Sequence, residues 1–231
     1  MRSIALPPIF ALLVVGLLVS TGCKDPAADV PEATVESPAE SGDEAAEGEA
    51  TDEAAGEEAE EEDTVESVEL AFSNETSSIG FTGSKVTGSH DGGFNEFAGT
   101  VTLVGEDPTA SSVEVTIQMA SVFTDSDRLT GHLQNDDFFD VPNHPTGSFT
   151  STSIREGGDG EATHTMTGDL TLRGTTNRIS FPATIQVDES SVKASAEFSI
   201  NRMDFGINYA GREDDLIREL VVLRLDIDAP R

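Results

Sequence analysis

The residues best placed to do chemistry in this 231-residue chain are His132, Asp136 and Asp140, spaced four apart. On a helix this spacing would put an imidazole and two carboxylates on one face, as a metal site requires. The same pattern is also typical of an ordinary charged face on a surface helix. We therefore expect no metal site here. The acidic run at 213–215 lacks the full ligand spacing of a calcium loop.

The sequence also offers no set of residues suited to nucleophilic or acid–base catalysis. Cys23 is the only cysteine, and the four histidines, His90, His132, His144 and His164, are dispersed along the chain. No Gly-x-Ser-x-Gly, His-Glu-x-x-His or glycine-rich phosphate loop after a strand occurs. Because catalysis needs a nucleophile with a base, a split carboxylate pair or a metal cluster, we expect no enzyme and no catalytic residues.

The elements that would position any site are strands, marked by strict alternation of apolar and polar residues. In one run, Val113, Val115 and Ile117 would share a face, with Glu114 and Thr116 on the other. Such a sheet must bury its apolar face, and closure into a barrel does so while removing exposed edges. We therefore predict an all-β fold, an antiparallel barrel of about eight strands. The predicted strands lie near 79–85, 94–104, 113–119, 147–154, 163–172, 179–187, 192–200 and 221–227.

One short helix is predicted at 127–138, where Leu129, Leu133 and Phe138 fall close to one face. The interior of an eight-stranded barrel is either filled by side chains or holds one small ligand. Here the inward positions mix large residues such as Phe198 with small ones such as Ala196. On periodicity alone a filled core is the default, and a ligand cavity is the alternative.

Five motifs along the domain carry a family resemblance. They are F-x-x-F-x-G at 94–99, HL-x-x-x-DFF-D-V at 132–141, F-x-ST at 149–152, TG-x-LT-x-x-G-x-T at 167–176 and INRMDFGI at 200–207. In these, and over roughly residues 68–229, the chain resembles the YceI-like family of periplasmic or secreted proteins. The resemblance implies a lipocalin-like, eight-stranded antiparallel β-barrel with the helix near its mouth. It also implies that the barrel holds a polyisoprenoid or another long amphipathic lipid.

The resemblance gives the lipid-binding role to large apolar side chains that face the interior or close the mouth. In the family the helix and the Phe138–Phe139 pair lie against a barrel mouth, where they would line or cover the lipid. The alternative is that the pair plugs the barrel end as ordinary core. The lipid-binding candidates are Phe81, Phe94, Phe97, Ile117, Leu133, Phe138, Phe139, Phe149, Leu170, Phe198 and Phe205.

A head group is expected near Asn201 and Arg202. If the ligand carries a phosphate, Arg202 is the expected receiver, because a bidentate arginine suits phosphate geometry. The structural alternative is that Arg202 pairs with Asp204 or another acid near the rim. The rival cations are Arg173, Arg178 and Lys85.

The N-terminus has the layout of a secretory signal: Arg2, an apolar run from 4 to 19, and then small residues before Cys23. The segment resembles a bacterial lipobox, in which the cysteine is lipidated and becomes the first mature residue, although Ser20 stands where Leu or Val is usual. We expect residues 1–22 to be a lipoprotein signal peptide and lipidated Cys23 to hold the protein to a membrane. An exported bacterial lipoprotein would lie on the periplasmic face of the inner or outer membrane, or on the cell surface. Ordinary secretion and a spanning helix are the alternatives, but the run is shorter than the ~20 residues that cross a bilayer.

Residues 23–67 are predicted to be a disordered acidic linker. From Lys24 to Ser67 there are 18 acidic residues, one base and no aromatic residue, so self-repulsion should keep the chain extended. Residues 68–231 are predicted to be the single barrel domain, with 26 acidic and 11 basic residues. Such a negative surface argues against nucleic acid as a partner.

We therefore predict a membrane-tethered binding protein that carries, stores or senses a polyisoprenoid or similar lipid in the cell envelope. No cofactor is expected other than the bound lipid, and the partners are the long-chain lipid and the membrane. Lipocalin-like proteins often pair, so a homodimer is left open by analogy. The alternative is a structural or interaction module of the envelope with a filled barrel core, and an enzyme with a hidden His/Asp site ranks third.

Overall fold

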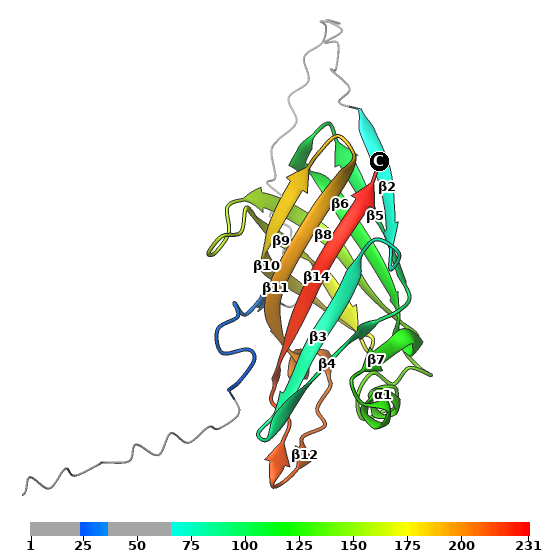
Figure 1. The fold of residues 1–231 in the computed structure, drawn as a ribbon, viewed down its shortest axis with the longest axis vertical. Helices are drawn as coiled ribbons and strands as arrows, with labels where there is room; N and C mark the ends of the chain where they lie inside the picture. The colour runs from blue at the N-terminus through cyan, green and yellow to red at the C-terminus, as the bar shows by residue number, and fades with distance from the viewer. Residues whose placement is uncertain (1–23, 37–65) are drawn as a thin grey trace, which may run out of the picture.

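The computed structural model describes residues 24–36 and 66–231, which form a curled, antiparallel β-sheet with a short helix at one end (Figure 1). The predicted all-β, barrel-like fold is confirmed. The helical elements are α1 (Asp127–Leu133) and the 3-10 turns η2 (Met119–Ser121) and η3 (Arg202–Phe205). The strands are β1 (Thr34–Glu36), β2 (Ser67–Ser73), β3 (Ser78–Lys85), β4 (Gly88–Phe94), β5 (Phe97–Val104), β6 (Asp107–Gln118), β7 (Val122–Thr124), β8 (Thr146–Glu156), β9 (His164–Leu172), β10 (Thr175–Val187), β11 (Ser191–Asn201), β12 (Gly211–Arg212), β13 (Asp215–Leu216) and β14 (Leu220–Pro230).

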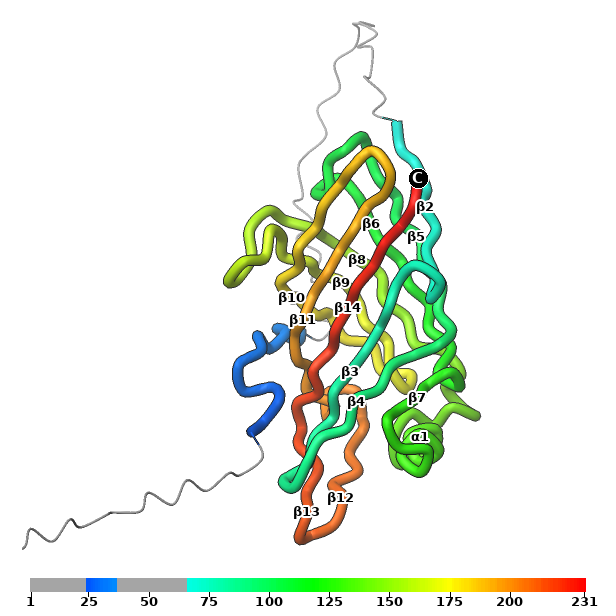
Figure 2. The backbone as a smooth tube through the Cα atoms, viewed as in Figure 1, coloured from blue at the N-terminus to red at the C-terminus, as the bar shows by residue number. Residues whose placement is uncertain are grey.

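Hydrogen-bonded neighbours in the sheet follow the order β2-β5-β6-β8-β9-β10-β11-β14-β3-β4-β7, and β1 pairs with β10. The sheet curls until the end of β14 lies beside β2 (Figure 2). At this closure Thr76 Oγ1 donates to the Asp228 carbonyl at 2.7 Å, and the Asp228 N–H donates to Ser77 Oγ at 3.0 Å. The curl turns one face of every long strand inward, which is the face that the alternating pattern makes apolar.

The prediction of about eight strands is too low for the described residues, because it omits β2, β4, β7 and the short β1, β12 and β13. Strand β4 lacks the apolar alternation, since three of its seven residues are glycines. One of them, Gly92, lies under a neighbouring aromatic ring: a Cβ there would be 2.5 Å from the Phe81 ring. The glycines that hide this strand from a periodicity search are therefore required by its packing.

The predicted helix is present but ends at Leu133 instead of Phe138. Asp136 and Asp137 would place negative charge at the C-terminal end of the helix dipole, which is unfavourable. The chain instead turns, with the Phe139 N–H donating to the Leu133 carbonyl at 3.0 Å and Asp140 at φ 50°. Within residues 24–36 and 66–231, no helix is long and apolar enough to cross a membrane.

Residues 24–36 correct part of the prediction that 23–67 is disordered. Ala27 and Ala33 are buried, β1 pairs with β10, and Arg218 Nη1 lies 2.8 Å from Asp25 Oδ2. The composition of this segment gave no sign of the contact, because the partner strands are far away in sequence. Residues 37–65 of the predicted linker, the predicted signal peptide and Cys23 lie outside the described residues.

Close contact between aromatic rings and glycines sets the spacing of the barrel wall. A Cβ built on Gly168 in β9 would lie 2.4 Å from Phe149 Cζ and 2.6 Å from the Thr150 carbonyl oxygen. Both distances are shorter than any ordinary van der Waals contact. The absence of a side chain at Gly168 therefore leaves room for the Phe149 ring against the neighbouring strand.

We expect Gly168→Ala to lower the free energy of unfolding by about 1–3 kcal/mol, because the added methyl group must displace a ring and a backbone carbonyl. Urea denaturation followed by circular dichroism measures this change. Gly83→Ala in β3 is the matched control, since a Cβ there meets nothing within 4 Å. Equal stability of the two variants would contradict the packing role given to Gly168.

Candidate ligand-binding cavity

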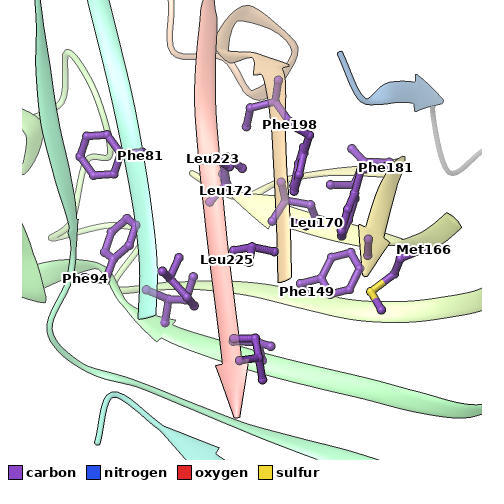
Figure 3. Close-up of a pocket in the computed structure, with 18 of the residues that line it drawn as sticks. Phe81, Phe94, Phe149, Met166, Leu170, Leu172, Phe181, Phe198, Leu223 and Leu225 are labelled. Atoms are coloured by element: carbon purple, nitrogen blue, oxygen red, sulfur yellow. The ribbon is translucent and has the colours of Figure 1, made fainter. Parts of the chain in front are cut away.

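Side chains on the inner face of the sheet enclose a cavity of about 430 Å³ (Figure 3). This volume falls within the ~300–1,000 Å³ typical of ligand pockets. The lining runs from Pro108 and Ser111 near the start of β6 to Leu129 and Leu133 in α1. The cavity therefore extends from one end of the barrel to the other, and most of its wall is hydrocarbon.

Aromatic rings form two opposite parts of the cavity wall. On one side, Phe181 and Phe198 are stacked, with ring centroids 4.1 Å apart and an interplanar angle of 10°, and Phe149 lies 5.8 Å from Phe181. On the other side, the Phe81 and Phe94 rings are 5.9 Å apart (Figure 3). The space between these groups is bordered by carbon atoms, so a ligand there would meet few hydrogen-bonding groups.

Ten of the eleven predicted apolar site residues line this cavity. Phe97 does not: it is buried in the surrounding hydrophobic core, at the first position of β5 and opposite Ile117. Its assignment to the ligand site is therefore corrected. The ten residues brought together are Phe81, Phe94, Ile117, Leu133, Phe138, Phe139, Phe149, Leu170, Phe198 and Phe205.

Several large lining residues were absent from the predicted set. Phe181, Leu223 and Leu225 occupy the apolar positions of predicted strands, so the alternation already pointed to them. Met166 lies on β9 in the same way. Phe72 lies on β2, which was not predicted although Val68, Leu70 and Phe72 alternate there with Glu69, Ala71 and Ser73.

The Phe138–Phe139 pair both lines the cavity and packs as core at the α1 end. Phe138 is buried and its ring centroid lies 4.9 Å from that of His132 and 5.4 Å from that of Tyr209. The Phe139 ring centroid lies 6.1 Å from that of Phe94. The two roles considered for the pair, lining the cavity and plugging the barrel end, are therefore both present.

His132, Asp136 and Asp140 do not converge. His132 Nε2 lies 2.9 Å from Asp137 Oδ2, and the Asp140 carboxylate accepts hydrogen bonds from Asn143 Nδ2 at 2.9 and 3.0 Å. Among the residues that the structure describes, no group of three or more His, Cys, Asp or Glu side chains gathers as a metal site would need.

Arg202 is placed differently from the predicted head-group receiver. It is only 5% exposed, and its guanidinium donates to the carbonyls of Arg218 at 3.0 Å, Ile217 at 3.3 Å and Ile207. Burial lowers the pKa of Arg202, and the nearby Glu219 opposes that shift. The side chain borders the cavity but acts as an internal brace for the chain around 207 and 217–218.

Asn201 and the rival cations also have partners within the protein. Asn201 Oδ1 accepts from the Met203 N–H at 2.9 Å and so caps η3. Arg178 forms two hydrogen bonds with Asp169, at 2.8 and 3.0 Å. Arg173 donates to two backbone carbonyls. The geometry therefore does not support a head-group role for Asn201.

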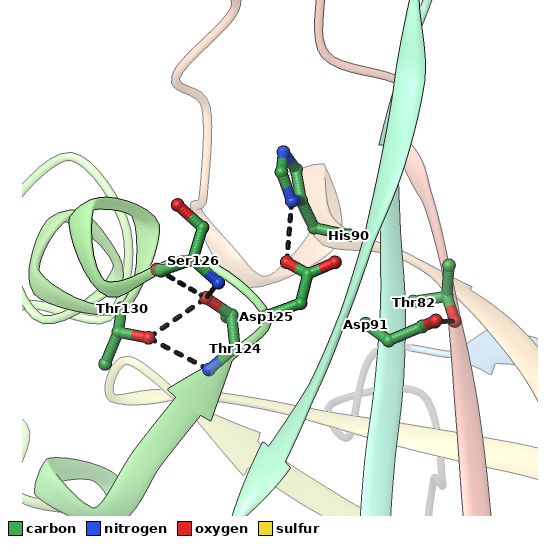
Figure 4. A network of polar contacts seen from close by, with 7 residues as sticks. All are labelled: Thr82, His90, Asp91, Thr124, Asp125, Ser126 and Thr130. Carbon is green, nitrogen blue, oxygen red and sulfur yellow. Dashed lines mark hydrogen bonds and ion pairs between the residues drawn. The ribbon is translucent and has the colours of Figure 1, made fainter.

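Two further basic side chains of the lining, Lys85 and His90, lie near the α1 end. Lys85 forms an ion pair with Asp215 and lowers the pKa of that carboxyl group. His90 Nδ1 lies 2.7 Å from Asp125 Oδ1, and this hydrogen bond lowers the pKa of Asp125. Figure 4 shows the pair beside the hydrogen bonds that hold Thr124 to the first turn of α1. Each basic side chain that lines the cavity thus has a partner within the protein.

Comparison with known proteins agrees with this architecture. Protein YceI of Escherichia coli O6:H1 (strain CFT073) is 36% identical over 136 residues, which cover 54% of this chain and 70% of that protein. The UPF0312 protein of Pseudomonas putida (strain W619) is 32% identical over 126 residues, which cover 52% of this chain and only 65% of that protein. The match therefore spans about two thirds of these relatives.

Two solved structures share the fold. BcnA of Burkholderia cenocepacia superposes with a TM-score of 0.60 at 20% identity, over 68% of this chain and 98% of that one. A polyisoprenoid binding domain from Saccharophagus degradans, implicated in plant cell wall breakdown, superposes with a TM-score of 0.55 at 16% identity, over 70% of this chain and 98% of that one. The YceI-like domain model matches residues 70–229. The chain therefore belongs to the YceI-like domain family.

Proposed function

We propose that the barrel binds the hydrocarbon chain of a long amphipathic lipid, with polyisoprenoids as the leading class. The observation that carries this proposal is the continuous apolar lining of one cavity along the barrel. Removing a hydrocarbon chain from water contributes ~25 cal/mol per Å² of apolar surface, less the cost of ordering the chain. The polyisoprenoid binding domain that shares the fold supports the same ligand class.

The extent of the lining favours a long chain. Cavity-lining residues on β10 run from Ile179 to Val187 and on β11 from Val192 to Ile200. At ~3.3 Å per residue, each run covers about 26 Å along its strand. A bilayer core is ~30 Å thick, so one leaflet accounts for about half of that. The lined length of each strand therefore exceeds the hydrocarbon thickness of one leaflet. This favours a ligand chain longer than an ordinary membrane acyl chain.

The charges around the cavity favour a head group that is neutral. Lys85 is paired with Asp215, and the guanidinium of Arg202 is occupied by backbone carbonyls. A phosphate would have to displace one of these partners and would then lie close to a carboxylate. An uncharged alcohol or carbonyl head group avoids that cost. We therefore favour a neutral lipid over a phosphorylated one.

We also propose that Cys23 carries the lipid anchor and that the barrel works at an envelope membrane, where it carries, stores or senses its ligand. The support is the arrangement of the apolar run and the small residues before Cys23. Stable attachment needs more than one acyl chain, and a lipobox cysteine would supply them. A protein held at the membrane would meet its lipid ligand at high local concentration.

Ala196→Phe should block the cavity without unfolding the barrel. Ala196 lines the cavity on β11, so the new ring would occupy the volume of roughly three methylene groups of the ligand. At ~0.8 kcal/mol per methylene, this predicts about fiftyfold weaker binding. Titration with a fluorescent polyprenol measures the Kd.

Ala98→Phe provides the matched control, because Ala98 is exposed on β5 and does not line the cavity. The control should bind as the wild type does, and both variants should keep the wild-type circular dichroism spectrum. Unchanged affinity in Ala196→Phe would show that lipid does not enter the barrel, and the filled-core alternative would then be favoured.

Cys23→Ser should abolish lipid attachment. In cells supplied with an alkyne-labelled fatty acid, we expect the wild-type chain to acquire the label and to sediment with membranes. The Cys23→Ser chain should remain unlabelled, whereas Ser20→Leu, which restores the usual lipobox residue, should keep the label. Label on Cys23→Ser, or none on the wild type, would contradict the proposed anchor.

A further inference from the structure

The barrel wall has a gap between β10 and β11. The two strands pair only over 184–187 and 192–195. Beyond the Thr184–Ser195 pair, each strand is paired only on its other side. There β10 pairs with β9 as far as Thr175, and β11 pairs with β14 as far as Asn201. The facing edges of β10 at 175–183 and of β11 at 196–201 therefore have no ladder with each other.

Residues 31–36, here called the side strand, fill this gap. Thr34, Val35 and Glu36 pair with Ser180, Ile179 and Arg178 on the β10 edge. On the β11 edge, the Ala33 N–H donates to the Ser199 carbonyl at 2.8 Å, and the Ser199 N–H donates to the Pro31 carbonyl at 2.8 Å. One segment thus bridges β10 and β11 where their edges no longer pair with each other (Figure 2).

The side strand continues the inward-apolar alternation of the wall. Ala33 and Val35 pack against the hydrophobic core, while Glu32, Thr34 and Glu36 are exposed. The cavity-lining residues on the two edges it joins are Ile179, Phe181, Ala183, Ala196, Phe198 and Ile200. The side strand therefore stands between these lining residues and the solvent.

The contact is also weaker than an ordinary strand pairing. Ser199 Oγ and Arg218 Nε are buried without a hydrogen-bond partner, and each such group costs about 1–3 kcal/mol. The ion pair between Arg218 and Asp25 is part-exposed, so it contributes little.

We propose that the side strand is a detachable part of the barrel wall. It would act as a lateral gate, here called the door, through which lipid enters and leaves the cavity. This inference rests on the proposed lipid-binding function. The side strand lies outside residues 70–229, the part of the chain that the YceI-like domain model matches. It begins eight residues after Cys23, a distance of at most about 28 Å for an extended chain, so a lipidated Cys23 would hold the door close to the membrane.

A reversible disulfide tests the door. Thr34 and Ser180 are direct Cα partners, a geometry compatible with a disulfide. The full chain would carry Thr34→Cys and Ser180→Cys, with Cys23→Ser so that only the introduced thiols react. The control is Thr171→Cys with Thr176→Cys, which links β9 to β10 and leaves the side strand free. Stopped-flow transfer of a fluorescent polyprenol from phosphatidylcholine vesicles is measured before and after reduction.

Oxidation of the Thr34–Ser180 pair should slow transfer by at least about tenfold, and reduction should restore the rate, as expected for a locked gate. Oxidation of the control pair should leave the rate unchanged. Equal rates in the oxidised and reduced forms, with normal binding, would overturn the door and leave the proposed function intact. Absence of binding in the reduced forms and in the wild type would overturn the proposed function, and the door with it.

Ser199→Ala gives a second test without a cross-link. Removing the unpartnered hydroxyl should strengthen docking of the side strand, so the Ala33 amide should exchange with deuterium more slowly and lipid transfer should slow. Amides between β11 and β14 should be unaffected. Faster exchange at Ala33, or unchanged exchange and transfer, would contradict weak docking as the basis of the door.

Discussion

The inner face of the curled sheet is apolar along nearly its whole length, and the rest of the structure depends on keeping that face from water. Because apolar and polar residues alternate, every long strand can present hydrocarbon inward only if the sheet curls around it. Rings such as Phe149 pack closely against glycines, while small residues such as Ala196 also line the cavity. The result is a wall with internal space, which a uniformly large set of side chains would have filled.

The placement and pairing of charged and polar side chains follow from the same constraint. Charge next to an apolar cavity is costly unless it is partnered, and Lys85, His90 and Arg202 each have partners within the protein. The acidic character of the domain is therefore confined to surfaces that contact water. A cavity of this kind selects ligands by length and apolar surface, with little electrostatic attraction for a charged head group.

The sequence predicted those parts of the fold that depend on local periodicity. Alternation identified four of the strands outright, supported four more, and placed Phe198 and Phe149 inward, since the two faces of a strand are encoded by neighbouring residues. Contacts between distant segments were not predictable in this way. The carbonyls that hold Arg202 come from residues 207, 217 and 218, and the partners of residues 31–36 lie more than 140 positions away. Strand β4 was missed because its glycines, required by the Phe81 ring, erase the pattern.

Occupancy of the barrel by a long-chain neutral lipid is the central claim, and it can be measured directly. Full-length protein purified from its own membranes without added lipid would be analysed by native mass spectrometry, followed by organic extraction and identification of the lipids. We expect about one long-chain lipid with an uncharged head group per protein, held in the folded barrel. Protein that is folded, stable and consistently free of lipid, or that holds only phosphorylated lipids, would contradict it.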